Sequence, residues 1–131
     1  INDSDTAIYH PYDKSLNRVE IIVIYEPDEN ETGHWKNCVV FGNGQLDRSP
    51  CSSGTCALLA LNYLKRRIHL GESLINESII GTQFIGKALE ETKVGKFDAI
   101  VPQIEARANI TGYHHFIIDH NDPLSQGFSL N

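Results

Sequence analysis

The sequence has 131 residues, 40% of them hydrophobic, and a formal net charge of −6. This length holds one ordinary globular domain at most. The acidic balance argues against nucleic acid and anionic membranes as partners, because both bind basic surfaces. No apolar run approaches the roughly 18 residues that a membrane-spanning helix needs.

The chain contains no methionine and begins with Ile1, so we expect it to be a piece of a longer protein. Any N-terminal targeting signal of that protein would then lie outside this sequence. The three cysteines, Cys38, Cys51 and Cys56, have no C-x-x-C spacing and make no even-numbered disulfide framework. A reducing compartment, by default the cytoplasm, is therefore the expected location.

Two short strands are predicted in the first third of the chain. Residues 19–25 (V-E-I-I-V-I-Y) are rich in β-branched side chains and end before Glu26-Pro27. Residues 37–41 (N-C-V-V-F) form a second apolar run, which ends at the turn signal Gly42-Asn43-Gly44.

Residues 52–70 form the only strong helical pattern. Ser52, Ser53 or Thr55 can cap its start, and Gly71 follows its last turn. The predicted helix is apolar on nearly all sides, so we expect a curved sheet to wrap around it. Its apolar stripe at helical spacing comprises Ala57, Leu61, Leu64 and Ile68.

The remaining sequence alternates with a period of two and is punctuated by glycines, at positions 81, 86, 95 and 112, which mark turns or bulges. The predicted strands cover residues 77–80, 83–89, 97–104, 107–111 and 113–118. Two strands, one central helix and a run of antiparallel strands define an α+β fold.

Cys51 lies where a polar loop meets the start of the predicted helix. A lone cysteine is more often a buried, inert thiol. A helix N-terminus, however, stabilises a thiolate, and its first N–H groups can hold a carboxylate. The sequence therefore offers Cys51 as a proton-transfer group, and the amides of Ser52, Ser53 and Gly54 as a carboxylate site.

The residues before Cys51 each have more than one interpretation. Asp47 is either a loop cap or an acceptor for a substrate ammonium, and Arg48 either binds substrate or braces the loop. Pro50 fixes the backbone that leads into Cys51. Phe41 either packs in the core or covers an apolar ring of the substrate.

The other thiols and the histidines do not suggest a second site. Cys38 and Cys56 are expected in the core, since Cys56 lies well round the helix from Cys51. His114 and His115 are adjacent in a predicted strand, so their side chains point to opposite faces. We predict no metal site.

The string at residues 47–57, D-R-S-P-C-S-S-G-T-C-A, resembles the second active-site motif of the proline racemase family, D-R-S-P-C-G-T-G-T-S-A. Weaker blocks extend the resemblance over the chain from about residue 19 onward. They are residues 41–42, 77–82, 90–95, 110–113 and 122–124.

This resemblance implies a fold similar to that of diaminopimelate epimerase, with two pseudo-symmetric α/β domains, each a barrel-like sheet around a central helix. Residues 1–131 would be most of the second, C-terminal domain plus the C-terminal tail. The first domain, absent from this chain, would be its partner, and a homodimer is compatible with such an enzyme.

The resemblance also implies proton transfer at the α-carbon of proline without a cofactor. One cysteine thiolate removes the proton, and a second thiol in the first domain protonates the opposite face. Cys51 would be one of the two bases, Asp47 the contact for the ring nitrogen and Phe41 part of the ring pocket. The amides of Ser52 and Ser53 would bind the carboxylate, and the chain alone would be inactive.

Departures from the family motif keep alternatives open. Ser52-Ser53 replace the usual Gly-Thr, and Cys56 replaces the usual Ser. The substrate alternative is 4-hydroxyproline, giving a 2-epimerase, although Phe41 favours proline over a ring that carries a hydroxyl. A family branch that dehydrates trans-3-hydroxyproline has Thr in place of Cys51. The last alternative is an inactive paralogue or a binding module for small amino acids.

Overall fold

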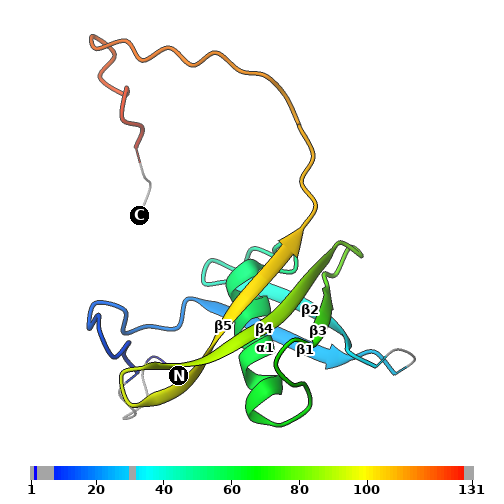
Figure 1. Ribbon diagram of the computed structural model, residues 1–131. Coiled ribbons are helices and arrows are strands. Elements are labelled where there is room, and N and C mark those ends of the chain that lie inside the picture. The colour runs from blue at the N-terminus through cyan, green and yellow to red at the C-terminus, as the bar shows by residue number, and fades with distance from the viewer. Residues whose placement is uncertain (1, 3–7, 30–31, 129–131) are drawn as a thin grey trace.

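The computed structural model describes residues 2, 8–29 and 32–128. This part of the chain forms one open mixed sheet of five strands and one α-helix that lies against the sheet (Figure 1). The elements are β1 (Ile21–Pro27), β2 (His34–Phe41), α1 (Ser52–Leu64), β3 (Ser73–Glu77), β4 (Gln83–Val94) and β5 (Phe97–Ala106). The predicted α+β class with a mixed sheet and a single helix is therefore confirmed.

The strands lie in the sheet in the order in which they occur in the sequence, β1-β2-β3-β4-β5. All neighbours are antiparallel except β2 and β3, which run parallel. A parallel pair needs a crossover connection, and here the connection between β2 and β3 contains α1. The order leaves β1 and β5 at the edges, so within the described residues the sheet is open and not a closed barrel.

One face of α1 packs on the sheet. Its buried residues are Gly54, Thr55, Leu58, Leu59 and Asn62, which recur at helical spacing. The predicted stripe is wrong in this respect, because Ala57 is exposed and Leu64 is 63% exposed. The helix is therefore covered along one side by this chain, and polar Thr and Asn side chains share that side with leucines.

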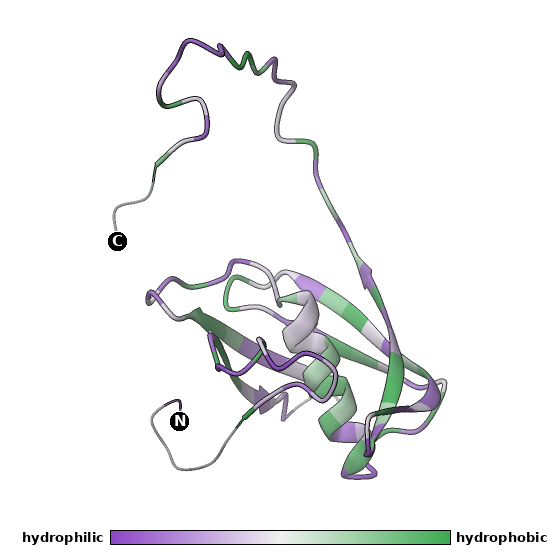
Figure 2. Cartoon of the chain, turned by 90° about the vertical axis from the view of Figure 1, so that its left-hand side faces the viewer, coloured by the Kyte–Doolittle hydropathy of each residue, from purple (hydrophilic) through white to green (hydrophobic). Residues whose placement is uncertain are grey.

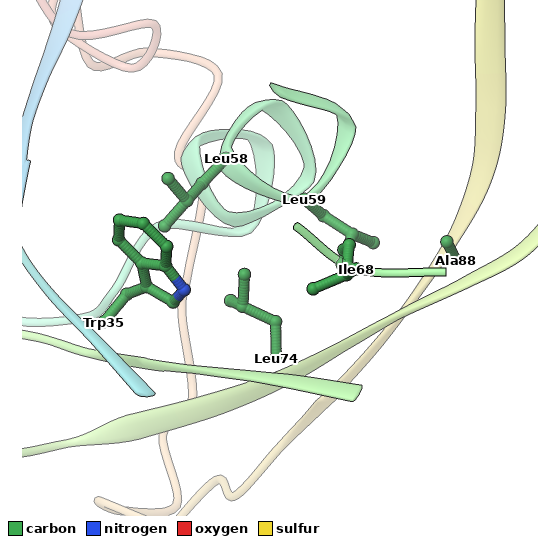
Figure 3. Packing of buried hydrophobic residues seen from close by; sticks show 6 residues of the cluster. All are labelled: Trp35, Leu58, Leu59, Ile68, Leu74 and Ala88. Atoms are coloured by element: carbon green, nitrogen blue, oxygen red, sulfur yellow. The ribbon is translucent and has the colours of Figure 1, made fainter. Parts of the chain in front are cut away.

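The hydrophobic core joins this helix face to the sheet. It comprises Trp35, Leu58, Leu59, Ile68, Leu74 and Ala88, all at most 7% exposed. Figure 3 shows Leu58 and Leu59 on the helix, with the Trp35 and Leu74 side chains extending toward them. Burying a large apolar side chain contributes about 1.5–3 kcal/mol, so this cluster fixes α1 over the middle of the sheet.

Two glycines allow the helix to approach the strands closely. A Cβ atom at Gly86 of β4 would lie 3.3 Å from Cγ2 of Thr55. At the start of the helix, a Cβ atom at Gly54 would lie 3.0 Å from Cγ2 of Val23 in β1. The first turn of α1 is therefore seated directly on the sheet.

The helix ends at Leu64, six residues before the predicted end at residue 70. Lys65 is its C-cap, Arg66 has a φ of 55°, and the N–H of Arg67 donates to the carbonyl of Asn62 over 2.9 Å. This i→i−5 bond with a left-handed residue is the Schellman arrangement that ends helices. It turns the chain so that Ile68 enters the core, which a continuous helix would not achieve.

Two of the later predicted strands shift or lengthen. The predicted strand 77–80 lies instead at Ser73–Glu77. Residues 78–82 form a turn in which the N–H of Ser78 donates to the Thr82 carbonyl and Gly81 has a φ of 81°. The predicted strands 83–89 and 97–104 extend to β4 and β5, which a tight turn containing Gly95 joins.

Residues 107–128 form a tail that leaves the end of β5 and runs away from the sheet (Figure 1). The predicted strands 107–111 and 113–118 are wrong for this structure, because no strand of the described chain lies beside them to accept their hydrogen bonds. Figure 2 shows hydrophobic stretches along the tail, away from the sheet and helix. Its exposed large apolar side chains include Ile110, Tyr113, Phe116, Ile117, Ile118, Leu124 and Phe128.

Candidate active site

Cys51 occupies the N-cap of α1, immediately before the first helical residue. Its Sγ accepts the N–H of Gly54 over 3.4 Å, and the hydroxyl of Ser53 also lies 3.4 Å from Sγ. The side chain is 8% exposed but is not a member of the apolar core cluster. The sulfur therefore sits among polar groups at the positive end of the helix dipole.

The backbone of Cys51 has φ 63° and ψ 121°. Among the described non-glycine residues, only Arg66 shares a positive φ. Such a conformation costs about 1–3 kcal/mol and persists only where the surroundings enforce it. Strain of this kind gathers at functional sites, so it singles out Cys51 independently of the sequence motif.

Hydrogen bonds engage the carbonyl groups on both sides of Cys51. Its carbonyl accepts both the N–H and the hydroxyl of Thr55, each over 2.8 Å. The preceding carbonyl, that of Pro50, accepts from Nδ2 of Asn37 over 2.8 Å. Nδ2 of Asn76 lies 2.9 Å from Oγ1 of Thr55 and 3.4 Å from the Pro50 oxygen.

The sequence analysis did not identify Asn37, Thr55 and Asn76 as site residues. All three are at most 5% exposed, and they come from β2, α1 and β3. Asparagine is depleted in strands, yet Asn37 begins the run N-C-V-V-F and Asn76 directly follows the apolar pair Leu74-Ile75. An asparagine adjoining an apolar run was the available signal.

Hydrogen bonds between its own residues stabilise the loop before Cys51. Oδ1 of Asp47 accepts the N–H of Ser49 over 2.8 Å, and Oγ of Ser49 accepts the N–H of Cys51 over 3.1 Å. The hydroxyl of Thr82 donates to the Arg48 carbonyl over 3.0 Å. Asp47 therefore acts as a loop cap in this structure, through one of its two carboxylate oxygens.

A cavity of about 720 Å³ lies along the outer side of this loop. It is lined by residues 47–49, 80–85, 105–107 and 109. The half-buried Asp47 and the exposed Arg48 place opposite charges at its wall. The loop thus borders open space on the side away from the core.

The remaining predicted site residues lie around the helix start. Ser52 and Ser53 are exposed, whereas Gly54 is buried. Phe41 is half-buried at the end of β2, and the period of two places it on the same face of the strand as Asn37. The first four N–H groups of a helix have no intrahelical acceptor. That of Cys51 donates to Oγ of Ser49 and that of Gly54 to Sγ of Cys51, which leaves the amides of Ser52 and Ser53 for a bound anion.

The other two cysteines differ from Cys51. Cys38 and Cys56 are free thiols of intermediate burial. Burial, and then the nearby Cys51, raises the pKa of the Cys56 thiol. This shift disfavours the thiolate form of Cys56.

Neither a metal site nor a membrane-spanning helix occurs among the described residues. No group of three or more His, Cys, Asp or Glu side chains in this part of the chain is arranged to hold a metal ion. In the same residues, the helix is neither long nor apolar enough to span a membrane.

The sequence of the chain is similar to those of a known protein family. The sequence model of the family described as "Proline racemase" matches residues 2–129. The chain belongs to the proline racemase family. A proline racemase of Acetoanaerobium sticklandii is 48% identical over 94% of this chain, and a 4-hydroxyproline 2-epimerase of Shewanella loihica is 40% identical over 92%.

The fold agrees with a solved structure of the same family. A hydroxyproline epimerase from Agrobacterium vitis, determined with bound trans-4-hydroxy-L-proline, matches 95% of this chain with a TM-score of 0.80 and 31% identity. The chain covers 35% of that protein, 37% of the Acetoanaerobium racemase and 36% of the Shewanella epimerase. It thus spans little more than a third of the length of these relatives.

Proposed function

We propose that the intact protein containing this chain is an isomerase that inverts the α-carbon of proline without a cofactor, and that Cys51 is one of its two proton-transfer groups. The observation that carries this proposal is the sulfur at the N-terminus of α1, held there by a strained backbone and receiving the N–H of Gly54. Membership of the proline racemase family supplies the reaction class.

In the proposed reaction, the Cys51 thiolate takes the α-proton, so that a C–H bond breaks and an S–H bond forms. The electron pair left on carbon spreads into the substrate carboxylate. A second thiol, outside this chain, then delivers its proton to the opposite face and becomes the thiolate. The reverse turnover exchanges the two roles, and no oxidant or reductant is consumed.

The substrate carboxylate is assigned to the N–H groups of Ser52 and Ser53. Donors at a helix start, aimed at developing negative charge, are the kind of group that stabilises such an intermediate. Gly54 contributes differently, because its N–H is directed to Sγ and its missing side chain admits Val23. Its proposed role is to hold the sulfur and the helix start in place.

Asp47 and Phe41 are assigned to the ring of the substrate. Asp47 uses one oxygen to cap the loop, so we assign the other to the ring nitrogen. Phe41 lies on the helix side of β2 and is proposed to cover the apolar ring carbons. Burying one or two methylene groups against it is worth about 0.8 kcal/mol each.

We further propose that this chain is the second of two domains of the diaminopimelate epimerase type, with the cytoplasm as its location. The open sheet and the exposed apolar tail both support a missing partner. The partner would be the remainder of the same polypeptide, since the relatives are almost three times as long. It would supply the second thiol and close the cleft over Cys51.

The test uses the full-length protein and L-proline in D₂O. Wild type should exchange the α-proton for deuterium, seen by NMR, and optical rotation should decay to zero. Replacing one general acid–base group costs about 10²–10⁴-fold, so we expect Cys51→Ser to lose at least about 10²-fold. Full activity in Cys51→Ser would remove Cys51 from the mechanism, and no exchange in wild type would remove the reaction itself.

A second substrate is favoured by the similarity to the 4-hydroxyproline 2-epimerase and to the hydroxyproline-bound structure. The ring-covering position of Phe41 argues for proline, because a buried hydroxyl needs a polar partner. Differences of this kind are worth about 1–3 kcal/mol, so kcat/KM for the two imino acids should differ about tenfold or more. An inactive binding protein, which the Ser52-Ser53 change would allow, would bind proline without exchanging its α-proton.

A further inference from the structure

Side chains from three separate elements hold the two peptide groups that flank Cys51. Asn37 of β2 donates to the Pro50 carbonyl over 2.8 Å. Thr55 of α1 donates twice to the Cys51 carbonyl, from its N–H and from its hydroxyl, over 2.8 Å each. Asn76 of β3 connects the two groups, because its Nδ2 contacts both Thr55 Oγ1 and the Pro50 oxygen.

The buried positions of Asn37 and Asn76 are unfavourable for polar side chains. Asn37 and Asn76 are 5% and 0% exposed, and in the described structure the Oδ1 atom of each is buried without a hydrogen-bond partner. A buried acceptor left unpaired lowers stability. For Asn37, the Pro50 oxygen can only accept, so the side chain cannot rotate its amide to exchange the two ends. A valine or leucine would give these strands a better core, so their benefit lies in what the Nδ2 atoms bind.

The Nδ2 atoms of Asn37 and Asn76 bind the backbone next to the strained residue Cys51. With φ 63°, Cys51 would relax toward negative φ if its flanking carbonyls were released. Relaxation would swing Cβ and Sγ away from the Gly54 N–H, the contact that places the sulfur at the helix start. The hydrogen bonds thus act on the position of the sulfur through the backbone on both sides of it.

We propose that Asn37, Thr55 and Asn76 are positioning residues that lock Cys51 in its strained conformation and so aim its sulfur at the substrate. This inference rests on the proposed role of Cys51 as a base, but the position of the sulfur can also be measured without turnover. None of the three residues touches the substrate in the proposed reaction.

The test compares four forms of the full-length protein. Thr55→Val removes the hydroxyl and keeps the shape, including the methyl group that lies over Gly86. Thr55→Ser keeps the hydroxyl and removes that methyl group. Asn62→Ala is the matched control, since Asn62 is also 0% exposed with an unpaired Oδ1, but its Nδ2 donates to Leu58 within the helix. Each variant is measured against wild type for denaturation midpoint, kcat and KM with proline, and iodoacetamide labelling of Cys51 by mass spectrometry.

Displacing a reacting group by about 1 Å costs about 10²-fold in rate. We therefore expect Thr55→Val to lower kcat by about 10²-fold, with KM little changed, and to slow Cys51 labelling by about tenfold. Thr55→Ser should recover most of both rates. Asn62→Ala should lower the denaturation midpoint while leaving kcat and labelling close to wild type.

The inference is overturned if Thr55→Val labels and turns over like wild type, or if Asn62→Ala loses both rates to the same extent. If Thr55→Val does not fold, Asn37→Ala, which removes only the bond to Pro50, is measured in its place with the same expectations. A wild-type protein that does not exchange the α-proton of proline refutes the proposed function instead. In that case the labelling rates alone decide whether these residues position the sulfur.

Discussion

The two ends of α1 are closed in similar ways for different reasons. Each end has a non-glycine residue with positive φ, Cys51 at 63° and Arg66 at 55°. Arg66 is exposed and belongs to a common helix-ending turn, in which glycine would fit better. Cys51 is buried, and buried side chains from three elements hold it.

The two positive φ angles therefore have different surroundings: that of Arg66 lies in an exposed turn, and that of Cys51 lies among buried hydrogen-bonding side chains. At Arg66, no network of buried side chains within the described part of the chain holds the left-handed conformation, and the turn brings Ile68 into the core. At Cys51, three buried polar side chains, those of Asn37, Thr55 and Asn76, form hydrogen bonds around the strained backbone. Buried polar groups around a strained residue are typical of functional sites. Substitutions at the two ends of the helix should therefore differ in their effects on stability and reactivity.

The largest expected effect concerns the reason for the turn after α1. Ile68 is 6% exposed in the core, whereas Leu64 is 63% exposed on the helix. We expect Ile68→Ala to lower the free energy of unfolding by about 2–5 kcal/mol, measured by chemical denaturation of the full-length protein. Leu64→Ala is the control and should cost about 0.5 kcal/mol or less. Equal costs would mean that the core does not determine where the helix ends.

The next effect measures the strain at Cys51. Glycine adopts positive φ freely, and alanine does not. Cys51→Gly should therefore be more stable than Cys51→Ala by about 1–3 kcal/mol, the usual cost of such a conformation. Both variants lack the sulfur, so the comparison isolates the backbone. A Cys51→Ala protein as stable as Cys51→Gly would show that position 51 is not strained.

The third effect compares two thiols near the same end of the helix. Cys56 is the more exposed of the two, but burial and the nearby Cys51 raise the pKa of its thiol. Cys51 has the helix-start position. We expect iodoacetamide to label Cys51 at least about tenfold faster than Cys56 near neutral pH. The difference in labelling rate should narrow as the pH rises through the raised pKa of Cys56, because a larger fraction of Cys56 is then the reactive thiolate. Faster labelling of Cys56 at neutral pH would mean that exposure alone controls reactivity.

The smallest effect is a gain in stability at the other end. Arg66→Gly should raise the free energy of unfolding by about 1 kcal/mol, because glycine has no steric cost in the left-handed conformation. Lys65→Gly, at the neighbouring residue with φ −80°, serves as the control and should give no such gain. A loss of stability in Arg66→Gly would show that the arginine side chain, and not the backbone, stabilises this turn.

The start of the helix and the two strands before it were predicted from the sequence, because their signals are local. Capping residues and a β-branched run need no knowledge of distant contacts. The end of the helix was predicted six residues late, since Lys65, Arg66 and Arg67 are compatible with a helix and only the tertiary position of Ile68 excludes it. The tail strands failed for a related reason, because a strand needs a neighbour that the described chain does not contain.

The candidate site shows the same division. The motif at residues 47–57 placed Cys51 at the helix start correctly, and local hydrogen bonds explain why. The hydrogen-bond network of Asn37, Thr55 and Asn76 was not predicted. These residues lie up to 39 positions apart in the sequence and meet only when β2, α1 and β3 pack. The roles of Asp47 and Phe41 in binding stay predictions.

The exposed apolar side chains of the tail also affect how the molecule can be handled in the laboratory. Exposed, uncharged and apolar stretches such as F-I-I at residues 116–118 promote aggregation between chains. A recombinant piece that stops near Ala106 should therefore remain dispersed in light scattering at concentrations where the 131-residue chain precipitates. A protein made of the sheet and helix without the tail should therefore be better suited to crystallisation and spectroscopy.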